Sequence, residues 1–505
     1  MDVRWAALGE GGRPIYLYEK DRTTKFRQVL WGDYLRIEDE VSGGWLKVIW
    51  APKSADPPEV YIRKSDTVER RPLEVIFVDV GQGDGAVLIT PETGAKERVL
   101  VIDAGEGNNM GNFLNGRFGS YRAGFDFHAA VITHPDSDHY RGFRPLFSNH
   151  KVGFGTVYHN GLVERPVSGT WDKLGGLSPN DPATGRQYLT QLAIDDAVIQ
   201  AEFSNEQVNG MKLFPQTMFA ALENPKVKRF RMLSTAHGDR QGGKTYMPEF
   251  APSDGRGYTI EVLGPVVEAG PDGAPRLRRL GDYGETKNGH SVLLKLRYEG
   301  LQLLFGGDLN RRAEEFLLMH YAGIDSFPDP GTQAYAEMIN DASSTVRCDV
   351  LKVCHHGSSD ATDAFLAAVN PAAFIISSGD QEGHVHPRPD LLGRLGRFGR
   401  GPAPVLLSTE LQRSTRERAD RKLVEDLERD IETLAAQPSV ELRDSITNRV
   451  AELARSNVDV WGAIYLKTDG ERLITAFKIE AGTPVKRWFY FEYAFDETGQ
   501  LVLVE

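Results

Sequence analysis

One seven-residue run, from Thr133 to His139, constrains this chain more than any other segment does. The run AAVITH has the composition of a buried strand, and it is followed at once by Pro135-Asp136-Ser137-Asp138-His139, so that His134, Asp136, Asp138 and His139 lie close together. Burying two carboxylates and two imidazoles without a cation would cost several kcal/mol. The alternation of the run predicts that His134 and Asp136 bind one ion while Asp138 and His139 turn toward a second. The alternative is a polar surface turn.

Further polar side chains stand at the ends of other predicted strands. VLVIDAG ends near Asp103, whose carboxylate is suited to orienting a metal-bound imidazole. LQLLFGGD ends with Asp308, placed to bridge two cations, and LKVCHHGSS carries His355 and His356. The strand AAFIISSG precedes a Gly-His-Val-His-Pro segment that contains His386. Each signal is weak alone, but together they predict a metal site where several strands end.

The motifs DVGQGD, IDAG, THPDSDH, GGD, HHGSS and HP follow one another along the chain. In this order they resemble the metallo-β-lactamase-fold domain of ComEC-type competence proteins. The resemblance covers about residues 73 to 410 and is specific because the DVGQGD opening and the HHGS box occur together. It implies an α/β protein, an αββα sandwich with its metal site at one edge of the paired sheets, and a binuclear metal-dependent hydrolase.

The resemblance also assigns roles to individual residues. The metal ligands that it implies are His134, Asp136, Asp138, His139, Asp308 and His355. His386 would be either a further ligand or a proton donor near the scissile group. The residues expected to line the substrate site are Asp79, Gln82, Asp84 and Ser358.

Two features depart from that family. The membrane channel that accompanies the domain in competence proteins is absent from this sequence, so DNA import is not implied. The superfamily often supplies a histidine before the bridging aspartate, and here Asn288-Gly289-His290-Ser291 occupies that region. His290 is therefore either a ligand or a hydrogen-bonded loop histidine.

The expected chemistry follows from two divalent ions that share Asp308 and a bridging water. Such ions lower the pKa of the water and hold the attacking and leaving oxygens of an in-line displacement. Asp138 would orient the hydroxide, and protonated His386 or His356, or Lys352, would neutralise the departing alkoxide. Zinc or manganese is expected, and because the oxygen-rich ligand set shifts preference toward harder ions, magnesium is a further candidate.

The sequence favours a nuclease that hydrolyses DNA or RNA over a hydrolase of a small phosphodiester such as a cyclic nucleotide or choline phosphate. Other esterase or lactonase chemistry stays open, as does a non-enzymatic binding module. The net charge of −12 argues against a broad nonspecific contact with nucleic acid. Polymer contacts would then come from local basic clusters, at 226–231, at 276–279, and at Arg388, Arg394, Arg397 and Arg400.

The chain divides into four predicted segments. Residues 1–70 alternate short apolar runs with Gly-rich turns, which is typical of a small β-barrel of the Src-homology type. Residues 73–408 carry the catalytic motifs, 409–456 form a helical insert interrupted by Pro438, and 457–505 alternate again as strands. Within the second segment, YLTQLAIDDAVIQAEF predicts a helix. The barrel and the insert are candidate surfaces for a protein partner or a homodimer.

Composition bears on the compartment. No run approaches the roughly 18 apolar residues of a membrane helix, and the start of the chain lacks the pattern of a secretory signal. Cys348 and Cys354 lie in one predicted strand, where their Cα atoms would be far beyond the roughly 7 Å that a disulfide requires. We therefore expect a soluble, cytoplasmic protein without membrane contact.

Overall fold

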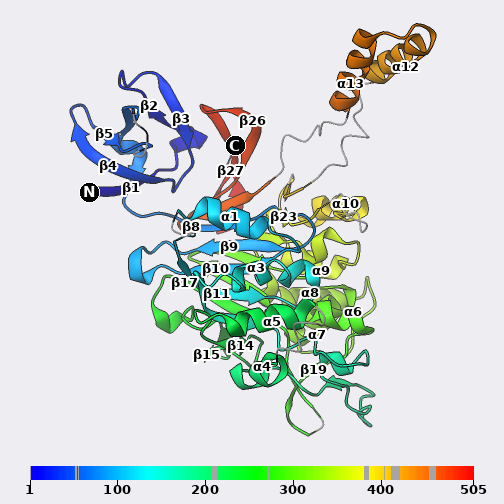
Figure 1. Cartoon of the computed structure of the whole chain (residues 1–505). Helices are drawn as coiled ribbons and strands as arrows, with labels where there is room; N and C mark the ends of the chain where they lie inside the picture. Colours follow the sequence, from blue (N-terminus) through cyan, green and yellow to red (C-terminus); the bar gives the residue numbers. More distant parts are fainter. Residues whose placement is uncertain are drawn as a thin grey trace.

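A computed structural model describes residues 2–504 apart from 52–53, 55, 120, 122, 206–212, 271, 380–385, 403, 411–420 and 454–461. Two large sheets form its body (Figure 1). In the described residues the first has the order β14 (Phe230–Met232), β12 (Val152–His159), β11 (Phe125–Ile132), β10 (Val99–Ala104), β9 (Gly85–Ile89), β8 (Leu73–Phe77), β25 (Ile464–Thr468), β26 (Arg472–Thr483), β27 (Lys486–Phe495), β28 (Leu501–Leu503).

The second sheet is built from later segments. Its order is β15 (Asp239–Gln241), β16 (Lys244–Tyr246), β17 (Tyr258–Gly264), β20 (Leu293–Tyr298), β21 (Leu301–Phe305), β22 (Val350–Lys352), β23 (Ala373–Ile376), β24 (Val405–Ser408). Strands β21 to β24 are parallel, so their carboxyl ends lie at one edge. Strands β10, β11 and β12 are likewise parallel in the first sheet.

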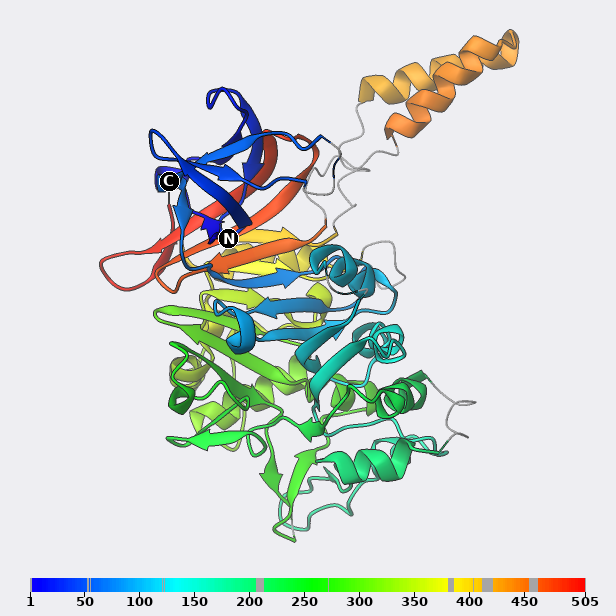
Figure 2. The ribbon, with the colours of Figure 1, turned by 60° about the vertical axis from the view of Figure 1, so that its left-hand side comes forward.

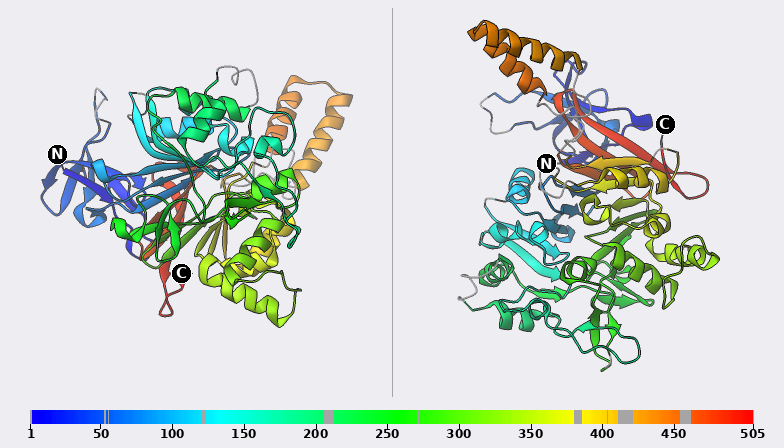
Figure 3. Two further views of the ribbon diagram at one scale, coloured as in Figure 1. Left: turned by 90° about the horizontal axis from the view of Figure 1, so that it is seen from below. Right: turned by 90° about the vertical axis from the view of Figure 1, so that its right-hand side faces the viewer.

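The two sheets face each other across one apolar core. Buried side chains of both contribute to it, among them Val75 and Leu88 from the first sheet and Leu294 and Leu303 from the second. On the outer face of the first sheet pack α1 (Asn109–Arg117), α3 (Phe143–Phe147), α4 (Asp196–Phe203) and α5 (Leu213–Glu223). On that of the second pack α7 (Arg311–Ala322), α8 (Gln333–Val346), α9 (Asp363–Val369) and α10 (Pro389–Phe398). The chain is thus α/β, with helices outside and strands between them (Figure 3).

The N-terminal module is an open antiparallel sheet rather than a closed barrel. In the described residues its order is β3 (Lys25–Val29), β2 (Ile15–Tyr18), β6 (Val60–Arg63), β5 (Trp45–Val48), β4 (Tyr34–Val41), β1 (Asp2–Ala6), β7 (Thr67–Val68). The expected barrel was wrong because β3 turns toward the C-terminal hairpin instead of toward β7: the Gln28 backbone N–H donates to the Pro484 carbonyl oxygen (2.9 Å).

The C-terminal strands belong to the body of the molecule. β25 pairs antiparallel with β8, so it extends the first sheet, and β26 to β28 continue it beside the N-terminal module (Figure 2). Between β24 and β25 lie α12 (Arg421–Ala436) and α13 (Val440–Leu453), which stand away from both sheets in Figures 1 and 2. The Gly462 N–H donates to the Thr409 carbonyl oxygen (2.8 Å), so the helical pair leaves and rejoins the body at one place.

One predicted helix was half wrong. Tyr188–Leu189 of YLTQLAIDDAVIQAEF form β13, which pairs with β19 (Pro275–Arg278) beside β18 (Glu268–Ala269). Helix α4 begins only at Asp196 because the Asp195 carboxylate caps it, accepting hydrogen bonds from the next turn.

Two smaller expectations concern cysteines and membranes. Cys348 and Cys354 are both free and buried. Among the described residues, we find no helix with the length and apolarity that crossing a bilayer requires.

Candidate metal centre

Two imidazoles and one carboxylate converge where strands of both sheets end. His139 lies on the short helix α2 (Ser137–Tyr140) after β11, Asp308 follows β21, and His356 follows β22. Nε2 of His139 is 3.2 Å from Oδ2 of Asp308, and Nε2 of His356 is 3.1 Å from the same oxygen. The two Nε2 atoms are 3.3 Å apart. All three side chains are buried. These distances place three atoms that can ligate a metal close together.

Each of these imidazoles is held through its other nitrogen. Nδ1 of His139 is 2.9 Å from Oδ2 of Asp103, and that carboxylate also accepts the Thr133 N–H (2.8 Å). Nδ1 of His356 donates to the Ser377 carbonyl oxygen (3.1 Å) and lies 3.0 Å from Oδ1 of Asp84. This arrangement leaves both Nε2 atoms directed at Asp308, as metal-binding histidines require. Asp103 thus stands where its expected orienting role places it.

The atoms gathered here suit a cation. Asp84, His139, Asp308 and His356 each offer one ligand atom, all within 4.8 Å of one another, so the cluster can hold a metal ion. His134 adds a fifth group, since its Nε2 lies 3.9 Å from Oδ2 of Asp308 and has no hydrogen-bond partner among the described residues. Burial holds the pKa of His134 well below its usual range. A buried, neutral imidazole beside a carboxylate is an unmet acceptor that a cation would satisfy.

Asp138 borders the same point and ties the DVGQGD motif to it. Its Oδ2 lies 3.3 Å from Nε2 of His356 and accepts a hydrogen bond from the Gln82 side chain (3.3 Å). Gly83, with φ of +109°, passes so close that a Cβ there would stand 1.9 Å from the Asp138 carbonyl oxygen. The motif therefore needs glycine at this position, because the loop passes directly against the turn that carries Asp138.

The charges of the cluster support one another. Burial would raise the pKa of Asp308, but His139 and His356 outweigh it and hold that pKa well below the usual range. Burial would lower the pKa of His139, but Asp308 and Asp103 raise it well above the usual value. In the same way, Asp308 and Asp84 raise the pKa of His356 well above the usual value. The site is thus built for charged groups in close contact.

Lys352 lies against Asp84, the fourth member of the cluster. The Lys352 ammonium bonds the Asp84 carboxylate and donates to the Gly307 carbonyl oxygen (3.2 Å). Burial would lower its pKa, but Asp84 and Asp308 raise it above the usual value. Lys352 is thus a buried, protonated partner of Asp84, and it is not among the residues that line the cavity described below. Asp84 positions His356 and does not line the substrate cavity.

Three other expected residues lie apart from the cluster. Asp136 caps α2, accepting the Ser137 N–H (3.2 Å), and pairs with the Lys287 ammonium (3.0 Å). His355 is partly exposed, with Nδ1 3.7 Å from Oδ2 of Asp360. The open question of His290 is answered by its Nε2, which bonds the Arg278 carbonyl oxygen (2.6 Å) away from the site, and burial lowers its pKa to about 4.

A cavity of about 490 Å³ opens above the cluster. Its lining residues are Gln82, Glu106, Asp136, Ser137, Asp138, Asn288, Asp308, His355, His356 and His386. Of the expected substrate-lining residues, Gln82 is among them. The Asp79 carboxylate accepts the Gly81 N–H (3.2 Å), and the Ser358 backbone N–H donates to the His355 carbonyl oxygen (2.8 Å). Both residues therefore stabilise local turns.

The sequence missed Asn288 and Glu106 as lining residues, since neither belongs to a metal-binding motif. His384 of the Gly-His-Val-His-Pro segment lies outside the described residues.

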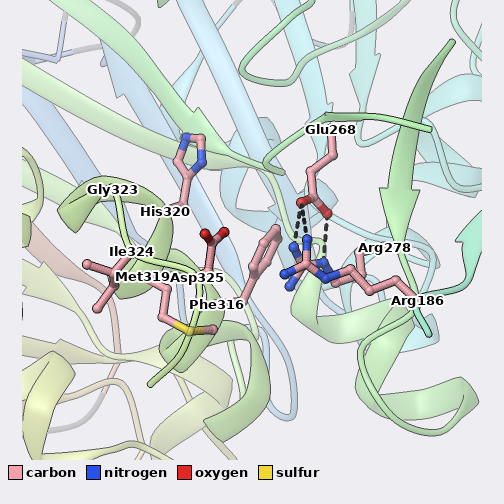
Figure 4. A pocket seen from close by; sticks show the side chains of 9 residues that line it. All are labelled: Arg186, Glu268, Arg278, Phe316, Met319, His320, Gly323, Ile324 and Asp325. Carbon is pink, nitrogen blue, oxygen red and sulfur yellow. Dashed lines mark hydrogen bonds and ion pairs between the residues drawn. The ribbon is translucent and has the colours of Figure 1, made fainter. Parts of the chain in front are cut away.

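Several residues of the basic clusters form ion pairs within the chain. Arg394 pairs with Asp363 (2.6 Å), and Arg400, almost fully buried, pairs with Asp349 (2.7 Å). Arg278 bonds Glu268 with two nitrogens beside a second cavity of about 190 Å³, shown in Figure 4. Arg278, Arg394 and Arg400 are therefore each engaged in an ion pair within the chain.

Comparisons with known proteins do not assign the chain to a family. No protein-family model matches it, and no curated protein matches it.

Proposed function

We propose that this chain is a metal-dependent phosphodiesterase of the metallo-β-lactamase fold that hydrolyses DNA or RNA. The observation that carries the proposal is the convergence of His139, Asp308 and His356 at the carboxyl ends of strands from two facing sheets, below an open cavity. The helix–sheet–sheet–helix layering and the order of the motifs along the chain support the same family.

The side chains present fit a divalent ion. Imidazole nitrogens suit zinc, and the carboxylates Asp138 and Asp308 extend the choice to manganese and magnesium. When bound, such an ion would polarise a phosphoryl oxygen and lower the pKa of a water molecule. Asp103 and Asp84 fix the two imidazoles, and the Gln82 amide holds Asp138 in place.

His386 is the group best placed to serve the leaving oxygen. It lines the cavity beside His355, with ring centroids 5.9 Å apart, whereas His356 is engaged among carboxylates. A protonated ring nitrogen of His386 would pass its proton to the departing alkoxide. Typical general-acid contributions to rate are roughly 10²–10⁴-fold.

A small phosphodiester is the second candidate substrate. The observation that favours it is the internal pairing of Arg394 and Arg400, which removes cations that a polymer would need. The nucleic-acid proposal depends instead on the similarity of the motif set to the ComEC-type domain.

A substrate panel tests both candidates. Chelator-treated protein would be reloaded with zinc, manganese or magnesium and given plasmid DNA, single-stranded DNA, RNA, a cyclic nucleotide and bis-p-nitrophenyl phosphate. We expect metal-dependent cleavage of DNA or RNA together with the chromogenic diester. Turnover of small diesters alone would replace the nuclease proposal by the second candidate, and no hydrolysis with any metal would contradict both.

A further inference from the structure

We infer that the centre binds one divalent ion rather than two, because Lys287 supplies a fixed positive charge at Asp136, where one of the two ions was expected. The inference rests on the proposed metal-dependent function and concerns the composition of the same site.

Lys287 is held rigidly in this position. It lies on α6 (Tyr283–Gly289), whose start is fixed by a capping box between Asp282 and Glu285. Its side chain is only 9 % exposed. The ammonium lies 3.0 Å from Oδ1 of Asp136 and 3.3 Å from Oε1 of Glu164. A buried ammonium needs such partners, so Lys287 cannot leave Asp136 without losing one of them.

Both oxygens of the Asp136 carboxylate have further partners. Oδ1, which pairs with Lys287, also accepts the Ser137 N–H (3.2 Å) at the start of α2. With its amide oriented to satisfy its neighbours, Asn288 donates to Oδ2 of Asp136 (3.1 Å) and to the Gly284 carbonyl oxygen (3.3 Å). A cation at Asp136 would have to displace an ammonium and an amide, and it would then face the displaced ammonium at short range.

The superfamily often supplies a further histidine before the bridging aspartate, and His290 lies in that region here. It does not replace Asp136 as a metal ligand. His290 bonds the Arg278 carbonyl oxygen, so it contributes nothing near Asp136. His134 was expected to bind the same ion as Asp136, but its Nε2 faces Asp308, 3.9 Å away. The ligand atoms therefore gather at one point, around Oδ2 of Asp308, and the other expected point holds Lys287.

Metal counting on four proteins tests this inference. Wild type, Lys287→Met, Asp136→Asn and the double variant would be saturated with Mn²⁺, dialysed, and examined by native mass spectrometry and by electron paramagnetic resonance. We expect about one ion per chain in wild type and in Asp136→Asn, with the signal of an isolated ion. Lys287→Met leaves Asp136 and Glu164 without their cation, so we expect a second ion and a spin-coupled signal. The double variant should return to one.

Two results would overturn the inference: two ions in wild type, or a single ion in Lys287→Met that circular dichroism shows to be folded. Lys287→Gln, which keeps a hydrogen-bond donor but not the charge, is the second variant if Lys287→Met does not fold, and the same gain of an ion is expected. Two ions in an active wild type would contradict this inference alone. A wild type that binds no ion and cleaves no phosphodiester would instead contradict the proposed function.

Discussion

At the scale of single residues, the centre depends on strained backbone. His355, His356 and Asp103 have φ values of +48°, +52° and +54°, in the left-handed region that L-residues avoid. Each such residue costs about 1–3 kcal/mol, and strain of this kind collects at functional sites. The left-handed conformation of His356 directs its side chain away from the line of β22, so that Nε2 lies beside Asp308. That of Asp103 brings its carboxylate to Nδ1 of His139.

Asp103→Asn tests the orienting role. The amide keeps the size of the carboxylate but loses the negative charge beside Nδ1 of His139. We expect metal affinity to fall about 10–100-fold, as for other groups that orient metal-binding histidines. Competition with a chromophoric chelator measures it. Asp126→Asn is the matched control, because Asp126 lies on the neighbouring strand β11, is exposed, and pairs with Lys226. An equal loss of metal affinity in both variants would refute the orienting role of Asp103.

Glu314 provides a pH test away from the metal centre. Burial raises its pKa from the usual 4.5 to about 8, despite hydrogen bonds from Thr362. The folded state thus binds the proton more tightly than the unfolded chain, so this group's stabilising contribution is complete below pH 4.5 and is lost as the pH rises to 8. The slope is at most about 1.4 kcal/mol per pH unit.

Glu314→Gln should remove this part of the pH dependence. Urea unfolding at several pH values would show the variant gaining stability relative to wild type as the pH rises toward 8. Parallel pH profiles for the two proteins would show that Glu314 is ionised in the folded state.

The sequence locates this centre better than it assigns the roles within it. Asp138, His139 and Asp308 could be placed because they follow strands within recognisable motifs. Sequence alone does not fix which nitrogen of His356 faces Asp84, since that depends on the turn after β22. It also does not reveal Lys287, which reaches Asp136 from a helix far along the chain.

At the scale of elements, capping residues and inter-strand pairing explain where sequence patterns succeeded or failed. Strands β10, β11, β21, β22 and β23 overlap the predicted strands, because apolar side chains on both of their faces are buried. The segment before α4 has helical periodicity, but pairing with β19 and the Asp195 cap override it. Helices α12 and α13 lie within the predicted helical insert, on either side of Pro438.

Removing α12 and α13 should leave catalysis intact. Thr409 and Gly462 are hydrogen-bonded to each other, so a short glycine–serine linker from Glu410 to Gly462 can replace residues 411–461. Loop length changes closure entropy little, by about 0.6 kcal/mol for each doubling. We expect unchanged hydrolysis of bis-p-nitrophenyl phosphate. A folded deletion variant without activity would show that the helices contribute to the site.

At the scale of the whole molecule, the first and last segments of the chain meet. Gln28 is buried, and its Oε1 accepts the backbone N–H groups of Arg487 (2.7 Å) and Trp488 (2.8 Å) in the C-terminal hairpin. Leu30 and Trp31 pack on Ile474 and Ala476 across the same boundary. Sequence could divide the chain into segments, but such contacts between residues hundreds of positions apart leave no local pattern.

Gln28→Ala should loosen this junction. Two backbone N–H groups would lose their acceptor at a part-buried position. A fully buried unsatisfied group costs about 1–3 kcal/mol, so the cost here is at most that for each group. We expect a lower urea midpoint than for Gln333→Ala, a control on an exposed helix surface. Equal midpoints would mean that water replaces the lost bonds and that the junction is not tightly packed.

The central claim is that a metal ion at Asp308 carries out phosphodiester hydrolysis, and one comparison tests it most directly. Wild type and Asp308→Ala would be reloaded with Zn²⁺ or Mn²⁺ after chelation, and bound metal and hydrolysis of bis-p-nitrophenyl phosphate would be measured on the same samples. We predict that wild type regains both together and that folded Asp308→Ala regains neither. Metal-independent hydrolysis by wild type, or full metal content and activity in Asp308→Ala, would contradict the account.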